Sequence, residues 1–192
     1  MESLEEKIRK DGKIFPGDIL NVSSFLNHQL DMDMLDKIGA ELYNLFHEDN
    51  ITKILTIEAS GIAIAVAAGM HFKVPVVFAK KSQTKNITSD CYSSSVFSYT
   101  HKNTYEARIE RQYLTDKDTV LIVDDFLANG LALAGLIDIC NQAGAKVAGC
   151  GIAIEKAFQD GGKNLRNKGI RVESLARVKS LDPEKGVEFV QE

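Results

Sequence analysis

The sequence predicts an α/β protein built on a doubly wound, mainly parallel five-stranded sheet with helices on both faces. Two observations support this prediction. Short apolar runs rich in β-branched residues recur along the chain, and segments with helical spacing follow most of them. These runs are apolar throughout and lack the alternation of a strand that shows one face to water. Both faces of the sheet are therefore expected to be covered.

The N-terminal part is predicted to form two helices joined by an irregular segment. Ser3 and Glu6 have the spacing of a capping box for a short helix that ends at Gly12. The Pro-Gly pair in IFPGDILNV forbids a central strand, so this segment is a loop or an edge. Asp31 can cap a longer helix over residues 32–48, in which apolar residues recur at helical spacing.

The strands and helices of the sheet follow. A small turn, ASG, leads from the first apolar run into an apolar helix, and Pro75 opens the second run. The helix after the third run is closed by Gly144. Strands are expected at residues 53–58, 75–79, 120–125, 146–155 and 171–178, and helices between them at 62–72 and 131–144.

One long segment breaks the alternation. Residues 81–105, KSQTKNITSDCYSSSVFSYTHKNTY, are polar, rich in serine and threonine, and carry no helical period. Connections of this length are usually functional or mobile. The segment is expected to form either a surface β-arm or a flexible flap over a site.

Composition bounds the class of protein. A chain of 192 residues, 44% of them hydrophobic, is long enough for one domain with a sizeable core. The formal net charge of −4 does not favour nucleic acid or an anionic membrane as a partner. No apolar run approaches the ~20 residues that span a bilayer, and the charged start MESLEEKIRKDG lacks the apolar core of a signal peptide. A cytoplasmic location is expected.

The cysteines and histidines suggest little chemistry. Cys140 and Cys150 lie inside apolar stretches, where a buried thiol is the more frequent outcome than a reactive one. The four histidines are scattered, with no spacing typical of a metal site or of a nucleophile relay.

Two adjacent carboxylates, Asp124 and Asp125, end the third apolar run. They repel each other, so a folded chain keeps them together only with partners or for a function. Ligands of open parallel sheets bind beyond the carboxyl ends of the strands, where this pair lies. Two carboxylates can accept hydrogen bonds from a ribose diol or hold a hydrated Mg²⁺. The alternative is a strand end with solvated acids.

The turn after the acids, from Leu127 to Ala132, opens directly into a helix. Backbone N–H groups at a helix N-terminus, with its partial positive charge, can bind a phosphate. Small residues let a phosphate approach the backbone closely. The stretch therefore offers a diol site beside a phosphate site, spaced as on a ribose 5-phosphate.

These residues carry a family resemblance. VLIVDDFLANGLA resembles the phosphoribosyl diphosphate (PRPP) binding signature of the type I phosphoribosyltransferases. FLNHQLD, TIEASGIAIA, PVVFAKK, GIAIEKAFQ and RVESLARVKSL extend the resemblance over most of the chain, and the ordered set is similar to the xanthine-specific branch of purine salvage. The resemblance implies transfer of ribose 5-phosphate from PRPP to N9 of xanthine, giving xanthosine 5′-monophosphate and pyrophosphate.

The resemblance also implies an organisation for the chain. Residues 1–192 would form a single phosphoribosyltransferase domain, with N-terminal helices and a small base-covering hood in 1–50 and the core in 51–180. Mg²⁺ would be bound through PRPP, and the polar flap would close over the site to exclude water. The flap of such enzymes reaches toward a partner subunit, which implies a homodimer.

The resemblance assigns roles to the residues of the PRPP site. Asp124 and Asp125 are expected to be the catalytic pair that holds the ribose hydroxyls, directly or through hydrated Mg²⁺. A second strand-to-helix turn, with Ser60 and Gly61, is expected to bind the pyrophosphate. A lysine pair at the end of the next strand could supply cations to it, although such a pair alone is often just solvated. The expected PRPP-binding residues are Ser60, Gly61, Lys80, Lys81, Ala128, Asn129, Gly130, Leu131 and Ala132.

The phosphate turn departs from the wider family, whose members usually place threonines there. Of the side chains between Ala128 and Ala132, only that of Asn129 can donate a hydrogen bond. The backbone is therefore expected to do more of the binding.

Base recognition is expected near Lys156, which follows the strand GIAIE at its carboxyl end. An ammonium donates hydrogen bonds and accepts none, so it favours a purine with an oxo group over adenine. Phe126 offers either a flat face for the purine or ordinary core packing. Leu20 and Asn27 are xanthine-binding residues by resemblance alone.

Other readings are open at this stage. The LIVDD stretch also occurs in phosphoacceptor receiver domains, but there the acid pair lies near the start of the chain, and here about two thirds of the chain precedes it. A PRPP-binding regulator of the same fold would carry an added basic DNA-binding part, which this chain lacks. Hypoxanthine or guanine could replace xanthine as the base.

Overall fold

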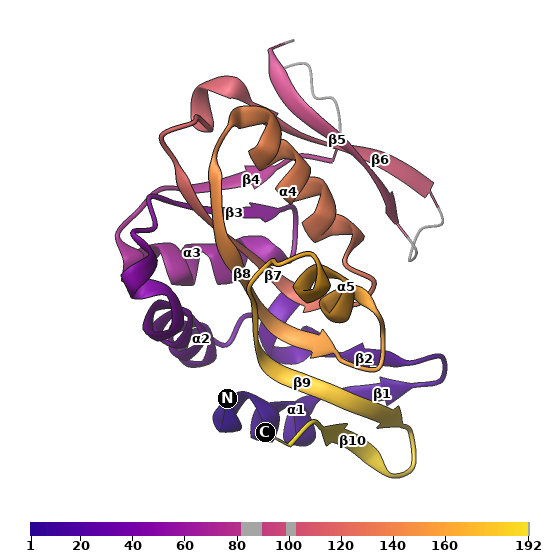
Figure 1. Cartoon of the computed structure of the whole chain (residues 1–192). Coiled ribbons are helices and arrows are strands. Elements are labelled where there is room, and N and C mark those ends of the chain that lie inside the picture. The colour runs from indigo at the N-terminus through magenta and orange to yellow at the C-terminus, as the bar shows by residue number, and fades with distance from the viewer. Residues whose placement is uncertain (82–89, 99–102, 192) are drawn as a thin grey trace.

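The computed structural model describes residues 1–81, 90–98 and 103–191. Its centre is a sheet with the strand order β10-β9-β8-β7-β3-β4 (Figure 1). The five expected strands are all present and run parallel to one another, which confirms the doubly wound, mainly parallel architecture. They are β3 (Lys53–Ile57), β4 (Val76–Ala79), β7 (Thr119–Leu127), β8 (Lys146–Lys156) and β9 (Val172–Asp182).

The count of five strands was wrong, because a sixth strand lies at the edge of the sheet. β10 (Gly186–Phe189) pairs antiparallel with the end of β9. Only Phe189 of its four residues is buried, so the segment has no apolar run that could predict a strand.

The strand order places the expected site at the centre of the sheet. From β3 the chain adds β4 on one side, and then β7, β8 and β9 on the other. The carboxyl ends of β3 and β7 therefore lie side by side at the point where the order reverses, the usual ligand position in such folds.

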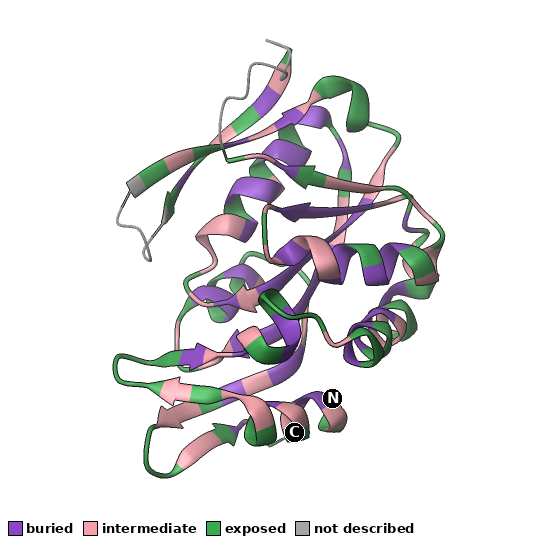
Figure 2. Cartoon of the chain, turned by 180° about the vertical axis from the view of Figure 1, so that it is seen from behind, coloured by how far each residue is buried: buried purple, intermediate pink, exposed green. Residues whose placement is uncertain are grey.

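Helices cover both faces of the sheet, and the buried residues follow the strands between them (Figure 2). One face packs against α2 (Met32–Phe46) and α3 (Gly61–Phe72), and the other packs against α4 (Leu131–Ala143). The Oδ1 atom of Asp31 accepts a hydrogen bond from the Met34 backbone N–H at 3.1 Å, which confirms the predicted cap. Gly144 ends α4 with a φ of 72°. A short helix that was not predicted, α5 (Gly161–Asn167), follows β8.

The N-terminal segment forms α1 (Glu2–Asp11), a two-stranded hairpin of β1 (Lys13–Phe15) and β2 (Ile19–Asn21), and a π-helical turn, η1 (Ser23–Asn27). The hairpin stays outside the central sheet, as its Pro-Gly turn requires. The predicted capping box of Ser3 is wrong, because the carbonyl of Met1 already accepts from the N–H groups of Leu4 and Glu5, both at 3.2 Å. Ser3 therefore lies inside the first turn.

The expected division into a hood and a core stays a prediction. α1 packs against β9 and β10, so the two chain termini are neighbours (Figure 1). α2, by contrast, packs against α3 and the sheet. Within residues 1–50, η1 (Ser23–Asn27) also packs against α3, whereas α2 is followed by the turn η2 (His47–Asp49).

The described part of the polar segment is a β-arm. β5 (Cys91–Ser98) pairs antiparallel with β6 (Asn103–Glu110), which continues into the turn η3 (Arg111–Tyr113). The hairpin lies on α4, where the Gln142 side chain donates to the Ser93 carbonyl at 2.8 Å. Residues 82–89 and 99–102 lie outside the described residues, so closure of the expected flap stays a prediction.

Cys140 and Cys150 are fully buried, which confirms the expectation of buried thiols, and burial raises the pKa of both to about 12. Among the described residues, no helix is both long enough and apolar enough to cross a bilayer.

Candidate active site

The acid pair lies near the carboxyl end of β7, at the centre of the sheet. Asp124 and Asp125 are each only 7% exposed, and the Asp125 N–H donates to Asp124 Oδ1 at 3.0 Å. Burial, and next the neighbouring charge of Asp125, raise the pKa of Asp124 well above its ordinary range. Two buried acids in contact cost stability, so this geometry favours a functional pair over a solvated strand end.

The turn after β7 has the geometry of an anion site. Gly130 precedes α4 with a φ of 79°, a conformation that glycine adopts without strain. The Asn129 Oδ1 atom accepts from the Leu131 N–H at 3.2 Å, so this side chain shapes the turn. The first N–H groups of α4 belong to a helix start with partial positive charge.

A cavity of about 170 Å³ joins Asp124, this turn and the β-arm. The described residues that line it come from β5, β6, β7 and the start of α4: Val96, Phe97, Tyr105, Asp124, Phe126, Leu127, Ala128, Asn129, Gly130, Leu131, Ala132 and Leu133. The structure thus brings all five expected phosphate-turn residues together with Asp124.

The second strand-to-helix turn reaches the same acids. Ser60 precedes α3, and Gly61 is its first, buried residue. A Cβ atom added at Gly61 would lie 2.2 Å from Thr56 Oγ1 and 2.9 Å from Asp124 Oδ1. Only glycine fits between the acid pair and β3, so the two turns converge on Asp124.

The two expected lysines separate. Lys81 lies 5.1 Å from the ring of Tyr105, and its charge opposes the rise in the Asp124 pKa that burial and Asp125 cause. Its backbone N–H donates to Glu58 Oε1 at 2.6 Å. The structure therefore brings Lys81 toward the acid pair.

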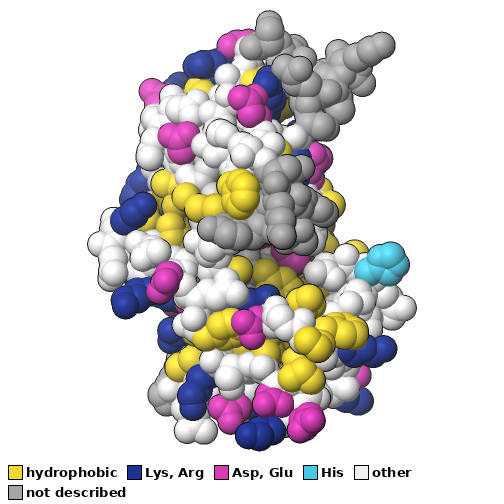
Figure 3. All heavy atoms as spheres, turned by 90° about the vertical axis from the view of Figure 1, so that its right-hand side faces the viewer, with side chains coloured by type: hydrophobic (Ala, Val, Ile, Leu, Met, Phe, Trp, Pro, Cys, Tyr) yellow, Lys and Arg dark blue, Asp and Glu magenta, His cyan; other side chains and the backbone are white. Residues whose placement is uncertain are grey.

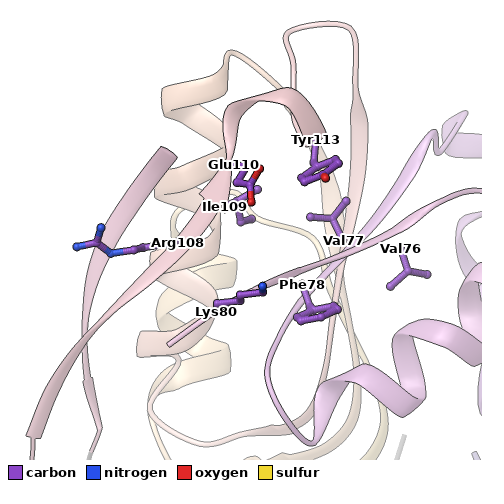
Figure 4. Close-up of a pocket in the computed structure, with 8 residues that line it drawn as sticks. All are labelled: Val76, Val77, Phe78, Lys80, Arg108, Ile109, Glu110 and Tyr113. Atoms are coloured by element: carbon purple, nitrogen blue, oxygen red, sulfur yellow. The ribbon is translucent and has the colours of Figure 1, made fainter. Parts of the chain in front are cut away.

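Lys80 turns the other way, as expected of adjacent residues in extended backbone. It exchanges two backbone hydrogen bonds of 3.0 Å with Arg108 on β6. Its side chain lines a different cavity of about 250 Å³ at the edge of the sheet (Figure 4). The other lining residues are Val76, Val77, Phe78, Arg108, Ile109, Glu110 and Tyr113.

The N-terminal segment contacts the expected base site at two points. Asn27 Nδ2 donates to Asp125 Oδ2 at 3.1 Å, so η1 reaches the acid pair. Lys156 Nζ donates to the Asp18 carbonyl at 2.8 Å, in the turn between β1 and β2. The same ammonium lies 5.9 Å from the ring centre of Phe126. Burial lowers the pKa of Lys156, and the charge of Asp18 opposes that shift.

Leu20 and Phe126 have different surroundings. Leu20 is 6% exposed, and its side chain packs in the core, away from open surface. Phe126 is half-buried; it lines the cavity and also packs against the core, so both roles considered from the sequence are compatible with its position. The face of the molecule on the side of the β-arm and of the β1–β2 hairpin carries hydrophobic side chains in its lower half (Figure 3).

Three residues of the site escaped sequence reasoning. Tyr105 lines the cavity, and burial, then the charge of Asp124, raise its pKa. Thr56 is fully buried, and its hydroxyl has no hydrogen-bond partner among the described residues. Gly161 packs on the backbone of the phosphate turn. Among these, only the adjacent glycines at 161–162, which begin α5, stand out in the sequence, and they do not indicate which residues they contact.

The described side chains offer few ligands for a metal ion. No group of three or more His, Cys, Asp or Glu side chains in the described ranges could hold an ion. Asp124 and Asp125 together can still accept hydrogen bonds from water on a hydrated Mg²⁺, an arrangement in which most ligands come from a phosphate substrate. The residues therefore fit a metal that arrives with its substrate.

Comparison with known proteins defines the class. Residues 21–164 match the phosphoribosyl transferase domain, and the chain belongs to this family. A xanthine phosphoribosyltransferase of Ruminiclostridium cellulolyticum is 54% identical over 182 residues, which are 95% of this chain and 96% of the relative. One from Bacillus cereus is 52% identical over 192 residues, which are 100% of this chain and 97% of the relative.

Solved structures support the fold. An adenine phosphoribosyltransferase of Thermoanaerobacter pseudethanolicus superposes with a TM-score of 0.75 at 21% identity. The match covers 90% of this chain and 98% of that one. At this identity the similarity concerns the fold alone.

Proposed function

We propose that this chain transfers the 5-phosphoribosyl group of PRPP to N9 of xanthine, releasing pyrophosphate and forming xanthosine 5′-monophosphate. The observation that carries the proposal is the buried acid pair between two strand-to-helix turns. One carboxyl pair and two anion-type turns match a substrate with one diol and two phosphate groups. Identity above 50% over nearly the whole chain to relatives named xanthine phosphoribosyltransferases supports the choice of base.

Different residues bind different parts of PRPP. Asp124 and Asp125 hold the ribose hydroxyls, and the backbone from Ala128 to Ala132 binds the 5′-phosphate. Ser60 and Gly61 bind the pyrophosphate, to which Lys81 adds a positive charge. Cationic charge develops at C1′ as the pyrophosphate leaves, so these residues act mainly by positioning and by stabilising the leaving group.

The base binds between the carboxyl end of β8 and the N-terminal segment. Lys156 donates to an oxo group of the purine, and Phe126 supports its ring. Asn27 and Leu20 belong to the segment that covers the base. Adenine would bring amino hydrogens against the ammonium of Lys156, which disfavours it.

Mg²⁺ fits this site as a companion of PRPP, held by the donor and, through water, by the two aspartates. When bound it neutralises the pyrophosphate. The cytoplasmic location expected from the sequence stays a prediction.

A homodimer formed through α3 and β4 is part of the proposal. α3 carries no Asp, Glu, Lys or Arg, and its outer residues Val66 and Met70 are 47% and 74% exposed. A helix that is apolar on every side is usually covered. Phe78 and Tyr113 around the cavity of Figure 4 extend this apolar surface. Lys80 and Glu110 of that cavity offer both charge signs, as a self-complementary interface needs.

A pyrophosphate-release assay with PRPP, Mg²⁺ and each of xanthine, hypoxanthine and guanine tests the proposal. Xanthine is expected to give the highest kcat/KM. A clear preference for hypoxanthine or guanine would move the activity to those bases. PRPP binding without release for any base would identify a regulator instead of an enzyme.

A further inference from the structure

The helix α5 contacts the phosphate turn through its first residue. The Gly161 N–H donates to the Ala128 carbonyl at 3.2 Å. A Cβ atom added at Gly161 would lie 2.3 Å from the Ala128 oxygen and 2.7 Å from the Gly130 nitrogen. Any other residue would therefore push the backbone of the turn, and α5 packs on that backbone with nothing between them.

The other end of α5 is held by an ion pair between Arg166, which is 33% exposed, and the buried carboxylate of Glu155, which also lies 3.3 Å from Arg177 Nε. Arg166 Nη1 and Nη2 donate to Glu155 Oε1 and Oε2, both at 2.8 Å, and Nη2 also donates to the Val172 carbonyl at 3.2 Å. Glu155 is 2% exposed. Two parallel hydrogen bonds fix orientation as well as distance. Burial alone would raise the pKa of Glu155, but the hydrogen bonds from Arg166, the neighbouring hydroxyl of Ser174 and the charges of Arg166 and Arg177 together hold the pKa below its ordinary value.

Gly162 connects the two contacts. A Cβ atom there would lie 2.0 Å from Glu155 Oε1 and 2.6 Å from Arg166 Nη1. Adjacent glycines thus touch the phosphate turn on one side and the ion pair on the other. Glu155 directly precedes Lys156 on β8, so the pair stands between the strand of the base site and the turn of the phosphate site.

Stability alone is a weak reason for such a pair. Apolar residues of similar volume often replace buried ion pairs at no cost, because desolvation cancels most of the attraction. What the fork adds over an apolar contact is a fixed placement of the helix. We infer that Glu155 and Arg166 are positioning residues that set the backbone of the 5′-phosphate turn through α5. The inference rests on the proposed function of that turn.

Calorimetric titration with PRPP and Mg²⁺ tests it on three variants of the full chain. The double variant Glu155→Leu/Arg166→Met removes the two parallel hydrogen bonds and keeps apolar volume, and it leaves Arg177 without its acid, so its stability is compared with that of the parent. Arg166→Lys keeps the charge and loses the two parallel bonds. Gly161→Ala perturbs the contact with the turn itself. Each is expected to raise the Kd for PRPP about tenfold, as loss of a supporting contact does at other sites. The KM for xanthine in pyrophosphate release is expected to change much less.

Gly169→Ala is the control, since nothing lies within 4 Å of a Cβ atom at that position. Thermal unfolding of every variant is recorded alongside. A double variant as stable as the parent with unchanged PRPP affinity would overturn the inference, as would equal losses for PRPP and xanthine. If the double variant does not fold, the PRPP affinities of Arg166→Lys and Gly161→Ala are used instead, and unchanged affinity in both would overturn the inference. If the parent chain binds PRPP but releases no pyrophosphate, the proposed function is wrong. The comparison of PRPP affinities among the variants still tests the role of Glu155 and Arg166.

Discussion

Replacing Gly130 with alanine separates the conformational need for glycine from its role in binding. Gly130 and Gly169 share a φ of 79°, so alanine at either position carries the same left-handed strain, about 1 kcal/mol. For a chain of this length that is a fall in Tm of about 2–4 °C. A Cβ atom at Gly130 would also lie 3.2 Å from Gly161 Cα, whereas at Gly169 it meets open space.

Only Gly130→Ala is expected to weaken PRPP binding, because its methyl group would press on Gly161 and shift the backbone of the turn, whose N–H groups bind the phosphate. Losing one hydrogen bond to a charged group costs about 1.5–3 kcal/mol, which corresponds to a rise in KM for PRPP of about 10- to 140-fold. Pyrophosphate release at varied PRPP and thermal unfolding measure the two effects on both variants. Equal KM values for PRPP in the two variants would refute the assignment of the turn.

Three further perturbations test other parts of the site. Asp124→Asn is expected to abolish transfer yet raise the Tm near neutral pH. The folded-state pKa of the Asp124 carboxyl is raised above 3.8, so this group destabilises the fold as pH rises through the raised value. The gain in Tm should vanish below pH 3.8, where both states are protonated. Lys156→Met is expected to raise the KM for xanthine about tenfold or more and leave that for PRPP nearly unchanged. Burial lowers the Lys156 pKa below 10.5, so its ammonium loses the proton as pH approaches 10.5. The parent should therefore lose xanthine affinity over that range, and the Lys156→Met variant should not. Met70→Glu places a charge on the exposed face of α3 and is expected to give a monomer in analytical ultracentrifugation.

For each of these three variants, one result would contradict the role assigned to the residue. An Asp124→Asn chain with near-normal transfer would remove the aspartate from the donor site, and one less stable than the parent at pH 7 would contradict its buried charge. Equal losses for xanthine and PRPP in the Lys156 variant would displace Lys156 from the purine edge. A Met70→Glu dimer would move the interface away from α3.

The sequence predicted what depends on local pattern. Continuous apolar runs gave the five parallel strands, and Asp31 gave the start of α2 through its side-chain cap. The acid pair and its glycine turn were visible because a buried run that ends in two carboxylates is rare without a function. β10 escaped because its pairing with β9 supplies what its own side chains do not.

The parts of the site that the sequence missed depend on contacts between distant residues. Lys80 and Lys81 look equivalent in the sequence, yet the pairing of Lys80 with Arg108 turns one away from the acids and leaves the other beside Tyr105. Likewise, nothing near Gly161 in the chain indicates that it touches Ala128, 33 residues earlier (161 − 128). Such contacts follow from the tertiary packing and carry no local signal.

Contacts of the N-terminal segment explain how the fold tolerates a costly site. Asp125 receives a hydrogen bond from Asn27, and Lys156 donates one to the Asp18 carbonyl, so the N-terminal segment partly satisfies the groups that would bind ribose and purine. A substrate must then exchange these bonds for its own, which lowers its net affinity but spares the fold a buried charge without a partner. Asp124 keeps a raised pKa, which burial causes first and the neighbouring charge of Asp125 next. It is therefore the acid whose environment should change most when a ribose diol binds.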